Sequence, residues 1–354
     1  MRTIRVTLPG RSYPIPIERG ILDAAGVVSR SFLLHATRIA VVTDSNVGPL
    51  YASRVATRMA SAGFQVKVIT IPAGESSKSM EMLSYLYGEL LDFGLTRTDA
   101  IAALGGGVVG DLAGFAAATI LRGVDFIQIP TTLLAQVDSS VGGKVAVDLP
   151  QGKNLAGAFW QPKLVLIDPE TLETLPQQVF MDGMAEVVKY GCIKDSAFFD
   201  FLEAHYSRKL LMDEMEHIVA TCCSIKRDVV EKDERDTGER MLLNFGHTLG
   251  HAYELAGQYT QWSHGQAVAA GMCDAAKLGV KLGVTPENVP GRIQRLLERL
   301  ELPTHIDCPA ETYAAAIGLD KKSSGDEIRV ILLEEMGKAV ARRMNRQKLL
   351  EELA

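Results

Sequence analysis

The sequence has few cysteines and no long apolar run. Its five cysteines contain no C-x-x-C pair, and their odd number favours a reduced compartment without a disulfide framework. No run of about 18 apolar residues is present. No apolar stretch follows Arg2 and Arg5, so we expect neither a membrane span nor a secretory signal. Cytoplasmic localisation follows as the default expectation.

Excess basic charge is also absent. The formal net charge is -6 over 354 residues, which argues against non-specific attraction to nucleic acid or to an anionic membrane surface. This balance leaves room for a local basic pocket that binds an anionic metabolite. Hydrophobic residues make up 47% and charged residues 23%, as in globular proteins, and the length suggests two domains or one large one.

Short apolar runs alternate with helical patterns in the first half of the chain. This alternation predicts a parallel sheet with crossover helices. The expected strands are residues 39–42, 66–71, 101–104, 126–129 and 164–167, and the expected helices are residues 49–62 and 79–93. A Pro-Gly turn between residues 4–8 and 13–17 predicts a small hairpin.

The pattern changes near residue 168. Helical periodicity follows to the end of the chain, with one strand expected at residues 328–333. We therefore predict an α/β domain over residues 1–170 and a mainly α-helical domain over residues 171–354.

A glycine-rich loop and three lysines are candidates for binding a phosphorylated ligand. Gly105, Gly107 and Gly110 form a G-x-G-x-x-G pattern, which suits a pyrophosphate at a helix N-terminus. The pattern follows the third expected strand rather than the first, so a glycine-rich turn without a ligand stays an alternative. The lysines Lys78, Lys144 and Lys153 each follow glycine or small residues in an expected loop. Each is either a phosphate ligand or a solvated surface lysine.

Three of the seven histidines lie close together in the sequence, at His247, His251 and His264. Histidines at i and i+4 share one helix face and can meet one metal ion, so His247 and His251 form a candidate pair. His264 offers a further ligand. Glu186 is a candidate carboxylate, because it lies in an apolar helical stretch where a charge needs a reason. Spacing leaves open which three or four groups bind the metal, and it does not separate zinc from other divalent ions.

Several longer motifs resemble those of the 3-dehydroquinate synthase family, in matching order over roughly residues 40 to 335. They are Pro72-Ala-Gly-Glu-x-x-Lys78, Gly105-Gly-Gly-Val-Val-Gly-Asp111, Gln128-Ile-Pro-Thr-Thr132, Val137-Asp-Ser-Ser-Val-Gly-Gly-Lys144, Gly152-Lys-Asn-Leu-x-Gly-Ala-Phe159 and Asn244-Phe-Gly-His247. One small departure is Ala73, where the family often has aspartate. The resemblance implies a Rossmann-like N-terminal domain that binds NAD and a helical domain that binds Zn²⁺ or Co²⁺.

The resemblance also implies individual site residues. The NAD-binding set is Asp44, Ala73, Gly74, Glu75, Ser76, Ser77, Lys78, Gly107, Val108, Val109, Gly110, Asp111, Thr131, Thr132, Lys144, Lys153, Thr171, Leu172, Glu173 and Thr174. The metal ligands are Glu186, His247 and His264, with His251 on the substrate side. The other catalytic or substrate residues are Asp138, Lys144, Asn154, Lys189, Lys226, Arg240, Asn244 and a lysine of the Lys321-Lys322 pair, here taken as Lys321. Arg122 resembles an arginine that reaches the phosphate site of a neighbouring subunit, which implies a homodimer.

The reaction that the resemblance implies belongs to the shikimate pathway. 3-Deoxy-D-arabino-heptulosonate 7-phosphate is converted to 3-dehydroquinate and phosphate through transient oxidation by NAD, phosphate elimination, reduction and aldol closure. The enzyme would be a carbon–oxygen lyase. Three alternatives stay open, namely another sugar phosphate cyclase, a metal-dependent polyol dehydrogenase and a non-catalytic regulator that binds NAD or a sugar phosphate. The many candidate lysines speak against a small neutral polyol as substrate.

Overall fold

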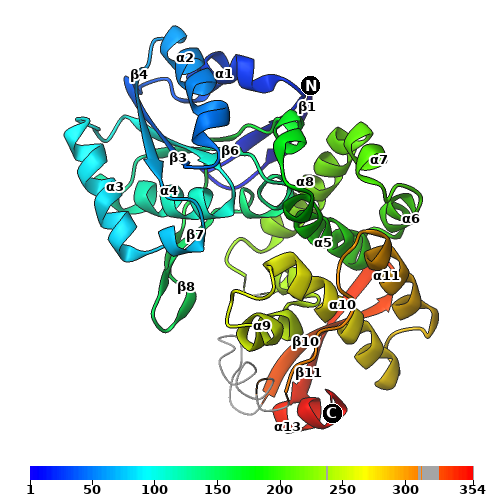
Figure 1. The fold of residues 1–354 in the computed structure, drawn as a ribbon. Coiled ribbons are helices and arrows are strands. Elements are labelled where there is room, and N and C mark those ends of the chain that lie inside the picture. Colours follow the sequence, from blue (N-terminus) through cyan, green and yellow to red (C-terminus); the bar gives the residue numbers. More distant parts are fainter. Residues whose placement is uncertain (237, 310–311, 313–326, 354) are drawn as a thin grey trace. The chain divides into compact units, whose positions relative to one another are not determined.

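The computed structural model describes residues 1–236, 238–309, 312 and 327–353 (Figure 1). The chain divides into two units, each with its own internal contacts. Unit 1 consists of Met1–Leu175 with Met215–Glu231, and unit 2 consists of Pro176–Glu214 with Lys232–Ala354. The predicted division at residue 170 treated each domain as one continuous segment. It did not anticipate that a later segment belongs with unit 1.

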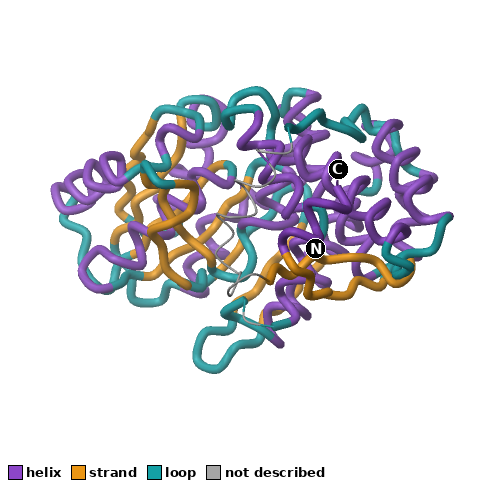
Figure 2. The backbone as a smooth tube through the Cα atoms, turned by 90° about the horizontal axis from the view of Figure 1, so that it is seen from below, coloured by secondary structure: helices purple, strands orange, loops and turns teal. Residues whose placement is uncertain are grey.

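A five-stranded parallel sheet forms the centre of unit 1. Its strands, in spatial order, are β4 (Gln65–Ile71), β3 (Arg38–Asp44), β5 (Ala100–Gly105), β6 (Asp125–Pro130) and β9 (Leu164–Val165). The five strands predicted from apolar runs are therefore confirmed, as is the α/β fold class. Figure 2 shows strands in orange running beside helices in purple.

Both faces of this sheet are buried, because helices cover each side. Leu83 and Leu86 of α3 (Met80–Asp92) and Leu112 of α4 (Gly107–Thr119) pack on one face. Val55 and Met59 of α2 (Ser53–Ser61) pack on the other, together with α1 (Ala25–Phe32). Burial on both faces explains why the strands read as continuous apolar runs rather than as alternating ones.

Two antiparallel hairpins complete the strands of unit 1. The predicted N-terminal hairpin is present as β1 (Arg2–Val6) and β2 (Tyr13–Ile17). The hairpin of β7 (Lys144–Leu149) and β8 (Gly152–Phe159) was not expected, and no residue of β8 is fully buried. Helix α8 (Met215–Lys232) supplies the later segment of unit 1.

Unit 2 is mainly helical, as predicted. Its helices are α5 (Gln177–Lys194), α6 (Ser196–Ala204), α7 (Arg208–Asp213), α9 (His247–Ala256), α10 (His264–Lys281), α11 (Asn288–Arg299) and α13 (Arg346–Leu353). The expected strand at residues 328–333 is β10 (Glu327–Glu335). It pairs with β11 (Lys338–Asn345), which was not expected because most of its side chains are at least partly exposed. Within the described ranges, no helix has the length and apolar character needed to cross a membrane.

Candidate active site

Glu186 is a buried carboxylate at the centre of a candidate metal site. It lies in α5, where every residue from Met184 to Ile193 is buried, and it has no exposed surface. Lys189, one turn later, forms an ion pair with it. Neither oxygen of Glu186 accepts a hydrogen bond of normal geometry from the described residues. A buried carboxylate whose oxygens lack hydrogen bonds is suited to bind a cation.

Two histidines direct nitrogen atoms at this carboxylate. His247 Nε2 and His264 Nε2 each lie 3.4 Å from Glu186 Oε1. The other ring nitrogens face acceptors. His247 Nδ1 lies 3.2 Å from the carbonyl oxygen of Phe245, and His264 Nδ1 lies 3.5 Å from Glu254 Oε1. A proton on Nδ1 leaves the lone pair of Nε2 available, which is the arrangement of a metal-binding histidine.

The backbone position of each histidine is fixed, because each is the first residue of a helix. His247 follows Gly246, which has a φ of 79° and precedes α9. A Cβ at Gly246 would lie 2.9 Å from the carbonyl oxygen of Val268, so only glycine fits there. His264 follows Ser263, which forms a capping box with Gln266 at the start of α10.

The charges of the site favour an ionised carboxylate and one neutral imidazole. Burial raises the pKa of Glu186, but Lys189 and His247 outweigh burial and hold that pKa well below its ordinary value. Burial and the charge of Lys189 lower the pKa of His247 to about 3. For His264, burial acts in the same direction, but Glu186 and Glu254 raise its pKa to about 10. A neutral His247 and a carboxylate are forms that bind divalent ions.

The structure brings together Glu186, His247 and His264, whose ligand atoms lie within 4.8 Å of one another. His251 lies one turn after His247 in α9, with ring centroids 5.8 Å apart, and it is not part of this group. One oxygen and two nitrogen ligands are a donor set typical of a catalytic zinc or cobalt site, in which water or substrate takes the fourth position. The geometry thus favours His264 over His251 as the partner of His247.

In unit 1, the candidate NAD residues lie at the carboxyl ends of parallel strands. Asp44 ends β3, the segment 73–78 follows β4, Gly107 follows β5, and Thr131 follows β6. The strand register pairs Asp44 with Ile71 and Gly105 with Pro130, so these ends meet at one edge of the sheet. Loops at this edge hold ligands in open α/β sheets.

Close packing at this edge explains two of the glycines. A Cβ at Gly105 would lie 2.7 Å from the side chain of Val109, and a Cβ at Gly110 would lie 2.8 Å from Gln128 Oε1. Gly107 is the first residue of α4, where unpaired backbone N–H groups can receive a pyrophosphate.

An ion pair links two loops at the same edge. Lys78 Nζ lies 2.6 Å from Asp111 Oδ2, and both side chains are mostly buried. Burial lowers the pKa of Lys78, but the Asp111 carboxylate more than compensates and raises it above its ordinary value. Lys78 therefore stays charged, as a group that binds phosphate must.

Two family models cover most of the chain. The N-terminal model of 3-dehydroquinate synthase matches residues 68–182, and the C-terminal model matches residues 183–323. This chain belongs to the 3-dehydroquinate synthase family. The 3-dehydroquinate synthase of Clostridium beijerinckii is 48% identical over 346 residues, which cover 98% of this chain and 99% of that one.

Solved structures of two sugar phosphate cyclases have a similar fold. A 2-deoxy-scyllo-inosose synthase in complex with carbaglucose-6-phosphate, NAD⁺ and Co²⁺ has a TM-score of 0.89 at 27% identity and covers 99% of each chain. The 2-epi-5-epi-valiolone synthase of Streptomyces hygroscopicus, with NAD⁺ and Zn²⁺ bound, has a TM-score of 0.87 at 26% identity. The match covers 98% of this chain and 97% of that one.

The substrate residues that the family resemblance implies fall in both units. Those in unit 1 include Asp138 and Lys226, which lie far apart in sequence. Lys226 of α8 forms an ion pair with Asp138 in the π-helical turn η5 (Ala135–Ser139), and its Nζ also donates to the Asp138 backbone carbonyl. Asn154 lies in β8 with a φ of 56°, and its backbone N–H donates to the Asp148 carboxylate over 2.7 Å.

In unit 2, Lys189 lies beside Glu186, and Arg240 and Asn244 lie in the short helix η7 (Glu239–Asn244) that precedes α9. Arg240 is 2% exposed and donates to the carbonyl oxygen of Glu234. Lys321 lies outside the described residues.

The other site residues that the family resemblance implies in unit 1 lie in short turns or at hairpin ends. Arg122 is exposed in η4 (Ile120–Arg122), with a φ of 69°. Lys144 begins β7, and Lys153 lies at the start of β8. The segment from Thr171 to Thr174 lies in the short helix η6 (Pro169–Thr174), where the Thr171 hydroxyl donates to the carbonyl oxygen of Asp168.

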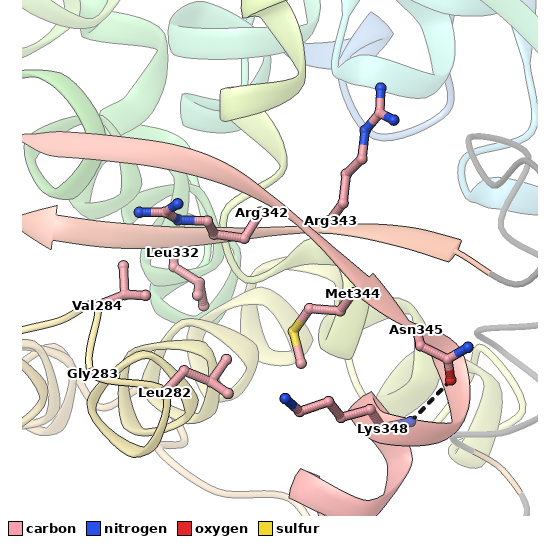
Figure 3. A pocket seen from close by; sticks show the side chains of 9 residues that line it. All are labelled: Leu282, Gly283, Val284, Leu332, Arg342, Arg343, Met344, Asn345 and Lys348. Atoms are coloured by element: carbon pink, nitrogen blue, oxygen red, sulfur yellow. Dashed lines mark hydrogen bonds between the residues drawn. The ribbon is translucent and has the colours of Figure 1, made fainter.

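A separate cavity of about 490 Å³ lies in unit 2 (Figure 3). None of the predicted site residues lines it. Its lining combines apolar side chains with three cations, and includes Leu282, Val284, Leu332, Met344, Arg342, Arg343 and Lys348. Arg342 also lies 3.7 Å from a carboxylate oxygen of Glu334.

Sequence reasoning missed two acidic residues that contact the metal group or its flanking residues. Glu254 faces His264, and Asp182 contacts both neighbours of His264. The helix start that Asp182 contacts could be predicted, since Ser263 and Gln266 form an S-x-x-Q capping pattern directly before an apolar run. No sequence pattern indicates that Asp182, on another helix, meets that cap.

Proposed function

We propose that this chain converts 3-deoxy-D-arabino-heptulosonate 7-phosphate to 3-dehydroquinate and phosphate, as a carbon–oxygen lyase that depends on NAD and a divalent ion. The observation that carries the proposal is the convergence of His247 and His264 on the buried carboxylate of Glu186, in a chain that is 48% identical to a curated 3-dehydroquinate synthase. The solved cyclases with NAD⁺ and Zn²⁺ or Co²⁺ support the same pair of cofactors.

The residues of unit 2 would hold the metal ion and the reacting hydroxyl groups. When bound, a divalent ion polarises a carbonyl and lowers the pKa of a coordinated hydroxyl. Glu186, His247 and His264 would supply its three protein ligands. Lys189 would fix a substrate oxygen near Glu186, and Arg240 would bind the carboxylate with its planar guanidinium. His251, one turn from His247, would move a proton between the substrate and solvent.

The residues of unit 1 would hold the dinucleotide and the phosphate. NAD, when bound there, would supply a reversible hydride acceptor for one hydroxyl-bearing carbon of the substrate. The N-terminus of α4, the charged Lys78 and the hydroxyl of Thr131 would position NAD at the carboxyl edge of the sheet. Lys144, Lys153 and the Asp138–Lys226 pair would hold substrate oxygens.

The proposal extends to assembly and location. Arg122 is exposed in a turn where Leu121, Arg122 and Gly123 all have positive φ, and from there its side chain would reach a neighbouring subunit. This supports a homodimer, and sedimentation of the purified chain measures it. The five cysteines form no disulfide with one another and four of them are buried, which supports a reducing cytoplasmic location.

One assay separates this proposal from a polyol dehydrogenase. The heptulosonate phosphate is supplied with the metal ion and a small amount of NAD, and phosphate release and NADH absorbance are followed together. Many phosphates per NAD, without accumulating NADH, support the proposal. One NADH for each product molecule would favour the dehydrogenase. Identification of 3-dehydroquinate as the product excludes another sugar phosphate cyclase, and absence of any turnover would favour a regulator.

Metal analysis tests the site itself. Glu186→Ala and His247→Ala should each bind zinc more weakly, because each removes one ligand of three. His205→Ala is a matched control in unit 2, since that histidine stacks on the Phe201 ring and its Nδ1 donates to the Phe201 carbonyl oxygen. Wild-type zinc affinity in both ligand variants would place the metal elsewhere.

A further inference from the structure

Asp182 joins the two helices that carry the metal-binding carboxylate and one metal-binding histidine. It lies in α5, one turn before Glu186 and on the same helix face. Its Oδ1 accepts a hydrogen bond from the Ser263 hydroxyl, one from the backbone N–H of Gly265 over 2.7 Å and one from the backbone N–H of Gln266 over 3.3 Å. These three donors all belong to the start of α10 or to the residue before it.

His264 lies between two of these donors. Ser263 precedes it and Gly265 follows it, so Asp182 contacts a side-chain hydroxyl on one side of the histidine and the backbone on the other. The Ser263 hydroxyl donates to Asp182 and also accepts from Gln266, so a carboxylate from α5 is added to the capping box of α10. A negative side chain at a helix N-terminus is stabilising in its own right.

Steric contact enforces the same junction. A Cβ at Gly265 would lie 2.1 Å from the backbone carbonyl oxygen of Asp182 and 2.6 Å from its Oδ1. The first turn of α10 can therefore approach α5 this closely only because residue 265 is glycine. The outcome is a distance of 3.4 Å between Glu186 Oε1 and His264 Nε2, in side chains that originate on different helices.

We propose that Asp182 is a positioning residue of the metal site, which sets the separation of Glu186 and His264 and thereby the affinity for a divalent ion. The inference rests on the proposed metal-binding function. Asp182 would not be a ligand, because it is not part of the group whose ligand atoms converge within 4.8 Å, and its Oδ1 accepts from three donors at the helix start. It acts through the backbone of His264. Groups that orient metal ligands change metal affinity by about 10- to 100-fold when they are removed.

The test compares Co²⁺ affinity and the visible absorption spectrum of bound Co²⁺ in the full chain. Asp182→Ala should raise the dissociation constant for Co²⁺ by about 10- to 100-fold and alter the spectrum, since the ligand geometry changes. Asp182→Asn keeps an oxygen acceptor at the same place and should restore most of the affinity. Ser263→Ala removes one donor and should raise the dissociation constant by an intermediate amount. If Asp182→Ala does not fold, Ser263→Ala serves as the test variant.

Asp195→Ala is the matched control. Asp195 caps α6 by accepting from the backbone N–H of Phe198 over 2.9 Å, so this variant also loses an aspartate cap in unit 2. It should lower thermal stability without changing the affinity or spectrum of Co²⁺. Equal Co²⁺ affinity in Asp182→Ala, Ser263→Ala and Asp195→Ala would overturn the proposal. Glu186→Ala, measured alongside, separates the two failures. If only Glu186→Ala loses Co²⁺, the role of Asp182 is refuted and the metal site stands. If Glu186→Ala binds Co²⁺ with wild-type affinity, the metal site itself is refuted.

Discussion

Asp99 is a fully buried carboxylate that directly precedes β5 and receives five hydrogen bonds. Its Oδ1 accepts from the backbone N–H groups of Thr37 and Arg38 over 2.9 and 2.8 Å, and from the Thr37 hydroxyl over 3.1 Å. Its Oδ2 accepts from the backbone N–H and the hydroxyl of Thr96 over 2.8 and 2.7 Å. The carboxylate thus connects the amino ends of β3 and β5, at the edge opposite the candidate NAD residues.

Replacement of Asp99 by asparagine should destabilise unit 1 by about 3–4 kcal/mol. The amide keeps the acceptor at Oδ1, but its NH₂ group replaces Oδ2 and faces the backbone N–H of Thr96. Two hydrogen bonds to a charged group are lost, and each contributes about 1.5–3 kcal/mol. Removal of the buried charge offsets part of this loss, so the lower end of the range applies.

Urea unfolding measures this change, because the chain has one tryptophan in each unit. Trp160 lies in unit 1 and Trp262 in unit 2. In a Trp262→Phe background, fluorescence therefore reports on unit 1 alone. Asp92→Asn is the control, since Asp92 is exposed at the end of α3 and its replacement should change stability by less than about 0.5 kcal/mol. At neutral pH the folded Asp99→Asn variant should bind NAD as the wild type does.

The pH dependence gives a second and independent measure. Burial raises the pKa of Asp99, but its hydrogen bonds with Arg38, Thr96 and Thr37 outweigh burial and lower it below the ordinary value. A depressed folded-state pKa contributes stability above the unfolded-state pKa, about 3.9, and this stability is lost as the pH falls through the folded-state pKa. The stability gap between wild type and Asp99→Asn should therefore narrow on acidification. A gap that stays constant from about pH 7 to about pH 3, or one no larger than that of Asp92→Asn, would refute the reasoning.

Three further predictions concern the proposed function. His251→Ala should keep its metal ion and lose about 10²-fold or more in kcat, because it removes a proton relay rather than a ligand, and metal analysis with steady-state kinetics shows whether the two effects separate. Lys153→Ala should weaken NAD or substrate binding by about 2–5 kcal/mol, and unchanged kinetics would make Lys153 a solvated surface residue. Gly110→Ala should weaken NAD binding measured by titration, because the new Cβ would lie 2.8 Å from Gln128 Oε1 and displace the start of α4, while an unaltered affinity would show that the packing relaxes freely.

The parallel sheet could be predicted because its strands are buried on both faces. Runs such as residues 39–42 and 101–104 are apolar throughout, and glycines or polar residues end them where the loops begin. The β7–β8 hairpin was not predicted, and only one strand of the β10–β11 hairpin was, since β8 and β11 each have exposed positions that blur the alternation of a strand. A local sequence pattern identifies a strand when burial is uniform along that strand.

The sequence alone determined which residue types could bind a metal, and tertiary structure decided which of them meet. Spacing placed His247 and His251 on one helix face, and it left Glu186 and His264 as separate candidates until the family resemblance grouped them. In the structure His247 and His264 direct Nε2 at Glu186 from the first residues of two helices, whereas His251 lies one turn away. That choice depends on how closely α5 and α10 pack, which Asp182 and Gly265 set across 83 residues of sequence. Sequence periodicity describes one helix at a time, so it does not give the distance between two helices.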